Sequence, residues 1–263
     1  MPRDLTNANI SDVVAFTRYF SKTGDPKDIA IMRVSQDHLR QVTGVENTYV
    51  VINLAEDKSD LPLPTRDNPI PNYLGTKLLY LPGGKEGGWG FGSTMSYILG
   101  TGVNMGWKVL NISNETRISR KLLMLMRSFL NEDRVACVGV KTPWHQAKEG
   151  WNDLNGASMP HNAVSLLDPS KVSGFYPASN LYGVEEITMI YEAWFRGYYT
   201  VLLDIDYEEW DFEWLHGDTT SVNSASREMS VSEKVHSKIE RANRLKRHLG
   251  MNSHEVKVLC VKV

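Results

Sequence analysis

The hydrophobic and polar positions along the chain follow both helical and strand periodicities, which predicts a mixed fold. Apolar residues at helical spacing predict helices, and these cover residues 9–22, 36–42, 93–99, 118–129 and 185–195. Runs rich in β-branched residues predict strands, and these cover residues 29–34, 48–54, 78–81, 107–112, 135–140, 162–167, 198–205 and 255–263. Ser113 or Asn114 is expected to cap the helix that contains residues 118–129. The pattern favours an α+β fold with a mostly antiparallel sheet and packed helices.

Composition changes along the chain predict four parts. Residues 56–76 are rich in proline and poor in large apolar residues, as is typical of a long surface loop or linker. We expect an N-terminal helix and strand segment over 1–55, this linker, a main α+β domain over 77–218, and a basic helix with a final strand over 219–263.

Charge and cysteine content narrow the function classes. The 263 residues include 29 Lys+Arg and 31 Asp+Glu, and this balance excludes a generally basic nucleic-acid binder. The charges are nevertheless segregated into an acidic stretch over 204–218 and a basic helix over 227–249. The two cysteines, Cys137 and Cys260, exclude a disulfide scaffold. No apolar run approaches the ~20 residues of a membrane helix, and no secretory signal begins the chain, so we expect a soluble, cytoplasmic or virion-associated protein.

Glycines gather in residues 83–106, ahead of and within a predicted helix. Such loops can cradle phosphates, but neither the P-loop nor the dinucleotide-binding glycine spacing occurs here. Trp89 and Phe91 lie between glycines and are candidate binding residues; the alternative is a flexible loop anchored by two aromatics. Ser93 lies near the expected helix start, where a nucleophile would be activated.

A histidine directly before a predicted strand is a candidate general base. His161 precedes the strand over 162–167, and Asp168 or Asn180 could orient its imidazole. The alternative interpretation is a surface or capping histidine.

Residues 88–203 resemble the papain-like fold in its C39-like cysteine peptidase form. The matching segments, in order, are GWGFGSTMSYILG, RKLLMLMRSFLNEDRVACVGV, PHNAVSLLD and VEEITMIYEAWFRGYYTVLLDI. The resemblance implies a cleft between residues 83–94 and His161. It places Gly88 or Trp89 where the family has its nucleophilic cysteine, which implies a degenerate, non-catalytic domain that acts by protein binding or assembly. The alternative is an active hydrolase that uses His161 with Asp168 or Asn180.

The acidic stretch supports a third hypothesis. Asp204 and Asp206 are spaced to share one face of a strand, and such carboxylates can bind Mg²⁺ or Mn²⁺ for phosphate-ester chemistry. A solvated acidic edge is the alternative, and the leading expectation is that no cofactor is bound.

Aromatic and basic residues near the end of the chain suggest partners. Trp210 and Trp214 are candidates for a protein interface, with core packing as the alternative. We therefore expect a protein partner or self-association, and no membrane. Nucleic-acid contact through residues Lys234 to Arg247 is possible but less favoured than a solvated helix.

Overall fold

The computed structural model describes residues 5, 8–21, 26–44, 47–54, 72–73, 76–81, 91–113, 116–143, 145–154, 164–172, 185–214 and 255–263. The helices are α1 (Pro26–Thr43), α2 (Phe91–Met105), α3 (Arg120–Leu130) and α4 (Glu185–Phe195). The strands are β1 (Val13–Ser21), β2 (Thr48–Leu54), β3 (Asn72–Tyr73), β4 (Thr76–Leu81), β5 (Lys108–Ile112), β6 (Thr116–Arg117), β7 (Val135–Val140), β8 (Gly150–Asp153), β9 (Val164–Leu167), β10 (Tyr199–Asp204), β11 (Glu213–Trp214) and β12 (Lys257–Lys262).

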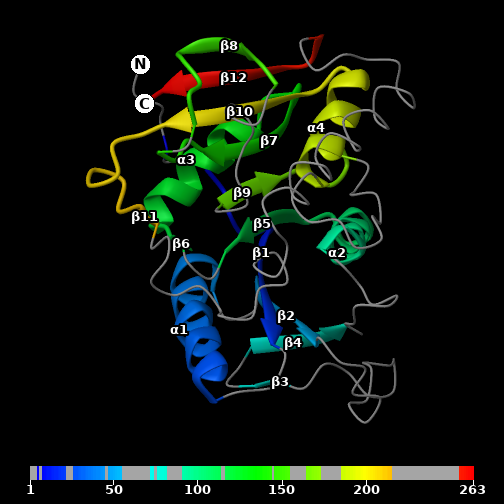
Figure 1. Cartoon of the computed structure of the whole chain (residues 1–263), viewed down its shortest axis with the longest axis vertical. Helices are drawn as coiled ribbons and strands as arrows, with labels where there is room; N and C mark the ends of the chain where they lie inside the picture. The colour runs from blue at the N-terminus through cyan, green and yellow to red at the C-terminus, as the bar shows by residue number, and fades with distance from the viewer. Residues whose placement is uncertain are drawn as a thin grey trace, which may run out of the picture.

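Among the described residues, one large sheet runs through the molecule in the order β3-β4-β2-β1-β5-β9-β7-β10-β12-β8 (Figure 1). Its parallel pairs are β1 with β2 and β5, β2 with β4, and β10 with β7 and β12. The antiparallel strands are β3 and β8 at the two edges and β9 in the middle, between β5 and β7. A small second sheet joins β6 and β11.

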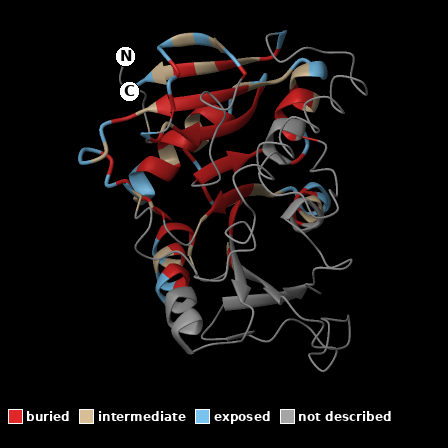
Figure 2. Ribbon diagram, in the orientation of Figure 1, coloured by how far each residue is buried: buried red, intermediate tan, exposed pale blue. Residues whose placement is uncertain are grey.

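Helices cover both faces of the large sheet, and each face has its own hydrophobic core. On one face, α1 and α3 pack over a cluster that includes Val13, Leu110 and Val138. On the other face, α2 and α4 pack over a cluster that includes Phe16, Val109 and Leu202. Figure 2 shows the buried residues concentrated in the described strands between these helices. The fold is therefore an open, mostly parallel sheet with helices on both sides.

Several elements follow directly from the sequence pattern. Helix α3 is strongly amphipathic and buries Leu122, Met126 and Phe129, as its spacing predicts. All residues of β7 are buried, which is typical of a parallel strand covered on both faces. Helix α4 and strands β2, β5, β10 and β12 also confirm the predicted segments to within one or two residues at each end.

Two N-terminal predictions are wrong. Residues 9–22 contain β1 rather than a helix; Val13 to Phe16 are buried in succession, as in a strand covered on both faces. Residues 29–34 belong to α1 rather than to a strand. The reason is topological: β1 and β2 are parallel, and parallel neighbours need a crossover connection, usually a helix. That requirement outweighs the local β propensity.

The predicted cap and the predicted sheet type also need correction. Ser119, rather than Ser113 or Asn114, caps α3, because its side chain accepts a hydrogen bond from the Leu122 amide. The short strand β6 separates Ser113 from the helix. The sheet is mostly parallel rather than mostly antiparallel, since the crossover helices return successive strands in the same direction. The mixture of helices and strands itself is confirmed.

The N-terminal strands β1 and β2 lie in the same sheet as β5 of the main body. The four-part division of the chain remains a prediction. Within the described helices, none is long and apolar enough to cross a membrane.

Candidate functional site

The order of the strands creates a switch point beside β1. The chain goes from β1 through α1 to β2 and then to β4 on one side, and it returns to β5 on the other side of β1. In open α/β sheets, ligands bind outside the carboxyl ends of the strands at such a point. We use the name carboxyl edge for the edge where β1, β5, β7 and β10 end, and amino edge for the edge where they begin. The fold thus directs attention to the carboxyl edge between β1 and β5.

Asn111 is a buried polar residue on β5, next to its carboxyl end. Asn111 is 1% exposed, and its Oδ1 atom is buried without a hydrogen-bond partner among the described residues. A buried polar atom left unpaired costs about 1–3 kcal/mol, so such atoms often mark a place where another group binds. Asn111 pairs with Phe16 of β1 in register, which places it at the switch point.

The strands beside β5 extend this polar position across the sheet. Asn111 lies opposite Ser165 of β9, and Ser165 lies opposite Gly139 of β7. Directly paired residues project their side chains to the same face, here the one covered by α2 and α4. Three adjacent strands therefore present an amide, a hydroxyl and a residue without a side chain, where a core would have apolar groups.

One step farther toward the carboxyl edge, a lysine and an aspartate form an ion pair. Lys141 follows β7 and Asp204 ends β10, with 2.8 Å between Nζ and Oδ2. The Lys141 backbone is fixed on both sides: its amide donates to Leu203, and its carbonyl accepts a hydrogen bond from Tyr207 at 2.7 Å. Burial, together with the charge of Asp204, raises the pKa of Tyr207 to about 12, so this phenol stays a donor.

Two helices begin at the same edge. Helix α2 leads through a short turn into β5, and α4 leads through a short turn into β10, so both helices run antiparallel to these strands. Their N-termini therefore lie toward the carboxyl edge. The first turn of α2 holds no acidic residue, whereas α4 begins with Glu185 and Glu186. The partial positive charge of a helix N-terminus favours an anionic ligand group.

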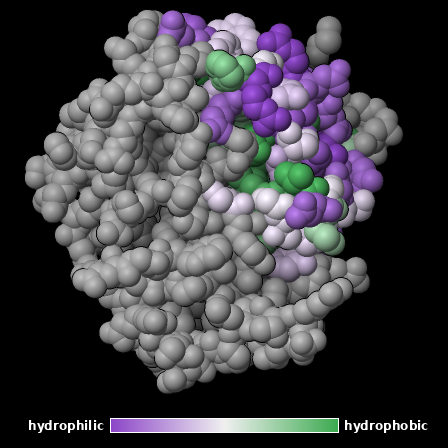
Figure 3. All heavy atoms as spheres, turned by 90° about the vertical axis from the view of Figure 1, so that its right-hand side faces the viewer, coloured by the Kyte–Doolittle hydropathy of each residue, from purple (hydrophilic) through white to green (hydrophobic). Residues whose placement is uncertain are grey.

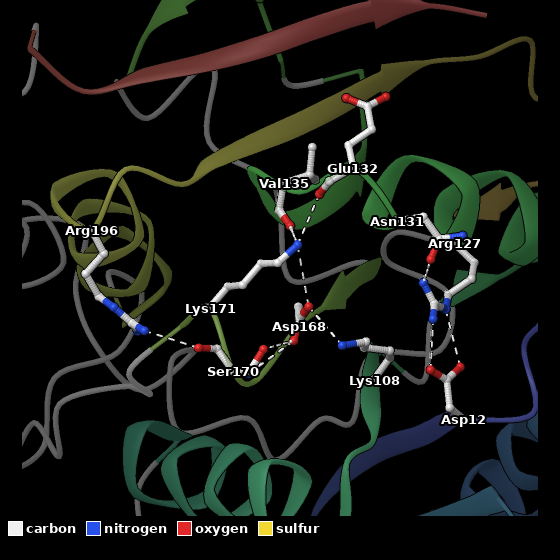
Figure 4. A network of polar contacts seen from close by, with 10 residues as sticks. All are labelled: Asp12, Lys108, Arg127, Asn131, Glu132, Val135, Asp168, Ser170, Lys171 and Arg196. Atoms are coloured by element: carbon white, nitrogen blue, oxygen red, sulfur yellow. Dashed lines mark hydrogen bonds and ion pairs between the residues drawn. The ribbon is translucent and has the colours of Figure 1, made fainter.

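The amino edge carries a second polar network, drawn in Figure 4. Asp168, which follows β9, contacts Lys108 of β5 at 2.8 Å and Lys171 at 3.6 Å, and it accepts a hydrogen bond from the Ser170 hydroxyl. Lys171 also donates to the carbonyls of Glu132 and Val135. Burial alone would raise the pKa of Asp168, but these hydrogen bonds and lysine charges outweigh it and lower the pKa below its usual value.

This network shows which side chains hold Asp168, the residue expected to orient His161. The carboxylate is 5% exposed and is held by two lysines and Ser170. It also lies at the amino edge, whereas Ser93, in the first turn of α2, lies toward the carboxyl edge. The four residues of β9 span about 13 Å, so this strand holds Asp168 far from the carboxyl edge.

Several other candidate residues lie outside the described residues: Trp89, His161, Asn180 and the basic residues from Lys234 to Arg247. Phe91 begins α2.

Asp204 and Asp206, the candidate metal ligands, make other contacts in the structure. Strand β10 ends at Asp204, so the two carboxylates do not share a strand face. Asp204 pairs with Lys141, and Asp206 accepts hydrogen bonds from the amides of Glu208 and Glu209, which closes a turn. Among the described residues, no group of three or more His, Cys, Asp or Glu side chains could hold a metal ion.

The tryptophans proposed for an interface lie against the core. Trp210 is buried in the cluster under α3, with Lys121 Nζ 4.3 Å from its ring centroid, and Trp214 packs partly buried against the same cluster. Other large hydrophobic side chains are exposed, among them Trp151 and Phe195. On the face shown in Figure 3, the described residues are mostly hydrophilic, with hydrophobic ones in small separate spots. A protein partner or self-association remains a prediction.

Sequence reasoning missed Asn111, Ser165 and Lys141. Asn111 and Ser165 interrupt otherwise apolar strands, in KVLNI and VSLL, and a polar residue inside a buried strand is a usable signal. Their meeting across three strands could not be seen, because it depends on the antiparallel insertion of β9 between β5 and β7.

Comparison with known proteins gives matches to solved structures alone. No family model matches the chain, and no curated protein matches it. It is similar to the mannosyltransferase PcManGT from Pyrobaculum calidifontis in complex with GDP-Man and Mn²⁺, at 11% identity and TM-score 0.44, over 72% of this chain and 53% of that one. It is similar to S. aureus TarS residues 1–349, at 12% identity and TM-score 0.43, over 71% and 57%.

A third similar structure is described as a nucleotide-diphospho-sugar transferase from Desulfovibrio desulfuricans G20, at 9% identity and TM-score 0.36, over 94% of this chain and 79% of that one. The chain thus spans little more than half the length of the first two proteins.

The architecture overturns the resemblance to papain-like cysteine peptidases. The sheet is mostly parallel and covered by helices on both faces, whereas that resemblance implied a mostly antiparallel sheet. The degenerate peptidase, the hydrolase and the metal-dependent phosphate-ester enzyme are therefore all withdrawn as functions of this chain.

Proposed function

We propose that this chain binds a nucleotide at the carboxyl edge of its sheet, at the switch point between β1 and β5. Doubly wound sheets bind nucleotides at this position because strands end and helices begin there, so that polar groups converge on one crevice. The observation that carries the proposal is Asn111, whose buried Oδ1 has no partner in the described part of the chain and can accept a hydrogen bond from a ligand hydroxyl or amine.

The surroundings of Asn111 fit such a ligand. Ser165 adds a hydroxyl beside the amide, and Gly139 on the next strand has no side chain. Helix α2 begins toward this edge without an acidic residue in its first turn, which suits the phosphate groups of a nucleotide.

The binding proposal is tested by calorimetric titration with ADP, GDP, CDP and UDP, and with UDP-glucose and GDP-mannose, each with and without Mn²⁺. We expect at least one of these nucleotides to bind. Asn111→Leu should weaken that binding about tenfold or more, because one buried hydrogen bond is lost.

Thr200→Val provides the matched control. Thr200 Oγ1 is also buried without a partner and lies on the same face, but at the beginning of β10, toward the amino edge. This variant should bind the nucleotide as the parent chain does. Equal weakening in both variants, or no binding of any nucleotide by the parent chain, would refute the proposal.

A further inference from the structure

The Lys141–Asp204 pair differs from the contacts of Lys171 in what it leaves unused, and from the Lys108–Asp168 pair in the exposure of its aspartate. A lysine ammonium has three N–H donors. Lys171, at the amino edge, directs its donors to Glu132, Val135 and Asp168. Lys141 Nζ donates to Asp204 alone among the described residues, so two of its donors have no protein partner there.

The pair is held in place and remains accessible. The side chains are 23% exposed for Lys141 and 36% for Asp204, whereas Asp168 is 5% exposed. The hydrogen bonds of the Lys141 backbone to Leu203 and Tyr207 fix the point from which the side chain extends. A partly exposed side chain whose backbone is held by hydrogen bonds and whose N–H donors are not all used is suited to contact a ligand.

The charges of the pair indicate which ligand group it suits. An isolated lysine would favour an anion, but Asp204 lies 2.8 Å from the ammonium and would repel one. Together the two side chains offer N–H donors and carboxylate acceptors with no net charge. A group that both accepts and donates hydrogen bonds satisfies both, and neighbouring hydroxyls do so.

The position of the pair connects it to the nucleotide site. Both residues continue the face that carries Asn111, Ser165 and Gly139, because Gly139 pairs with Leu202 and each residue lies two positions beyond its partner. Lys141 is on the second strand from Asn111, about 10 Å across the sheet at the usual strand spacing. One ligand can therefore reach both places.

We propose that Lys141 and Asp204 form a second subsite, which binds an uncharged, hydroxyl-bearing part of the ligand such as a sugar ring. This inference rests on the proposed nucleotide site for its location. The pair acts as donor and acceptor together: Lys141 donates hydrogen bonds to hydroxyl oxygens, and Asp204 accepts hydrogen bonds from the hydroxyls while it keeps the ammonium in position.

The first test compares GDP with GDP-mannose and UDP with UDP-glucose by calorimetry. In the parent chain, the sugar-bearing form should bind more tightly than the diphosphate. Lys141→Met should reduce this preference by about two- to tenfold, as expected for the loss of one or two partly exposed hydrogen bonds, and Lys141→Arg should restore part of it. A preference that is unchanged in Lys141→Met would overturn the subsite and leave the nucleotide site standing.

Lys257→Met is the matched control, because Lys257 pairs with Asp153 on the adjoining strands at the far edge of the sheet. It should leave the preference as in the parent chain. A loss of equal size in this variant would overturn the subsite, since the effect would then not be specific to Lys141.

A second test does not require a nucleotide. Acylation of lysines is followed by mass spectrometry in the presence of mannose, glucose or inorganic pyrophosphate. The hexoses should slow modification of Lys141 and leave Lys257, measured in the same sample, unchanged. Protection by pyrophosphate alone would show an anion subsite and overturn the proposal; protection by hexose without any nucleotide binding would refute the proposed function and support the subsite.

Discussion

The two edges of the central sheet each carry a lysine–aspartate pair with 2.8 Å between the charged atoms, yet the pairs differ in almost every other respect. At the amino edge, Asp168 contacts Lys108, Lys171 and Ser170. Lys171 also donates a hydrogen bond to the carbonyl of Val135 at the start of β7. At the carboxyl edge, Lys141 and Asp204 are partly exposed, and Asn111 lies nearby with an unpaired oxygen.

The difference shows how a structural cluster of polar groups can be distinguished from a functional one. In a structural cluster, the polar groups have their hydrogen-bond and charge partners within the protein. A buried charge is tolerated when several partners stabilise it, and the amino edge meets that condition. The carboxyl edge leaves donors and an acceptor unused at the place where open α/β sheets bind ligands. The number of partners around an ion pair therefore says more about whether its role is structural or functional than the presence of the pair itself.

The largest expected effect is the loss of the amino-edge network. Asp168→Asn should lower the free energy of unfolding by about 3–5 kcal/mol, because it leaves two lysines near a buried site without their counter-charge. Asp204→Asn should lower it by about 1 kcal/mol or less, since that pair is partly exposed. Urea unfolding measures both, and losses of similar size would remove the distinction between the edges.

Packing at the amino edge gives the next largest effect. A Cβ atom at Gly102 of α2 would lie 2.8 Å from Pro169 Cγ and 3.1 Å from Val109 Cγ2. Gly102→Ala should therefore cost about 1–3 kcal/mol by overpacking. Gly100→Ala, in the same helix with nothing within 4 Å, should instead stabilise by about 0.5–1 kcal/mol. Thermal unfolding that shows the same sign for both variants would contradict the tight packing of α2 on Pro169.

The unpaired atoms predict a smaller gain in stability. Asn111→Leu removes a buried polar group without a partner and should raise the free energy of unfolding by about 1 kcal/mol. Thr200→Val should stabilise by a similar amount for the same reason. Stability is measured in urea without ligand. A large destabilisation by Asn111→Leu would show that the amide already has a structural role, which would weaken the contrast between the edges.

Acid sensitivity allows a comparison of Asp168 with a titratable group outside both polar networks. Burial and the charge of Arg117 lower the pKa of His38 from 6.5 to about 4, and the Nε2 atom of His38 accepts a hydrogen bond from the Ile118 amide at 3.1 Å. Protonation therefore favours the unfolded chain, so stability is full above pH 6.5 and falls as the pH drops toward 4.

Substitution of His38 allows the acid response of Asp168 to be measured separately. His38→Gln should flatten the stability curve between pH 6.5 and 4. Because the pKa of Asp168 is lowered below 3.8, the stability it contributes should be present above that pH and be lost below it. Urea unfolding of parent and variant at a series of pH values tests this. Parallel curves down to pH 4 would contradict the role of His38.

Much of the secondary structure could be predicted, because the buried faces of α3, β7 and β10 produce clear patterns in the sequence. The errors at β1 and α1 arose where local pattern and global topology disagree. Residues such as Val13 to Phe16 read as a helix face in isolation and become a central strand only when neighbours cover both sides.

The candidate site was harder to predict than the fold. Asp204 was recognised as a chemically important position, but its partner Lys141 lies 63 residues away and is brought to it by the parallel pairing of β7 and β10. Asp168 was recognised too, but its partners Lys108, Lys171 and Ser170 were not. The antiparallel direction of β9 carries it to the edge opposite the carboxyl ends, and nothing in the local sequence reports strand direction.

The antiparallel strand in the middle of the sheet has a consequence for cooperativity. Within the described residues, β9 is the strand that joins the half formed by β4, β2, β1 and β5 to the half formed by β7, β10 and β12. The four residues of β9 thus make the backbone hydrogen bonds that link the two halves of the sheet. Exchange of the β9 amides with deuterium should therefore be as slow as global unfolding allows, and a proline in this strand would allow the two halves to open separately.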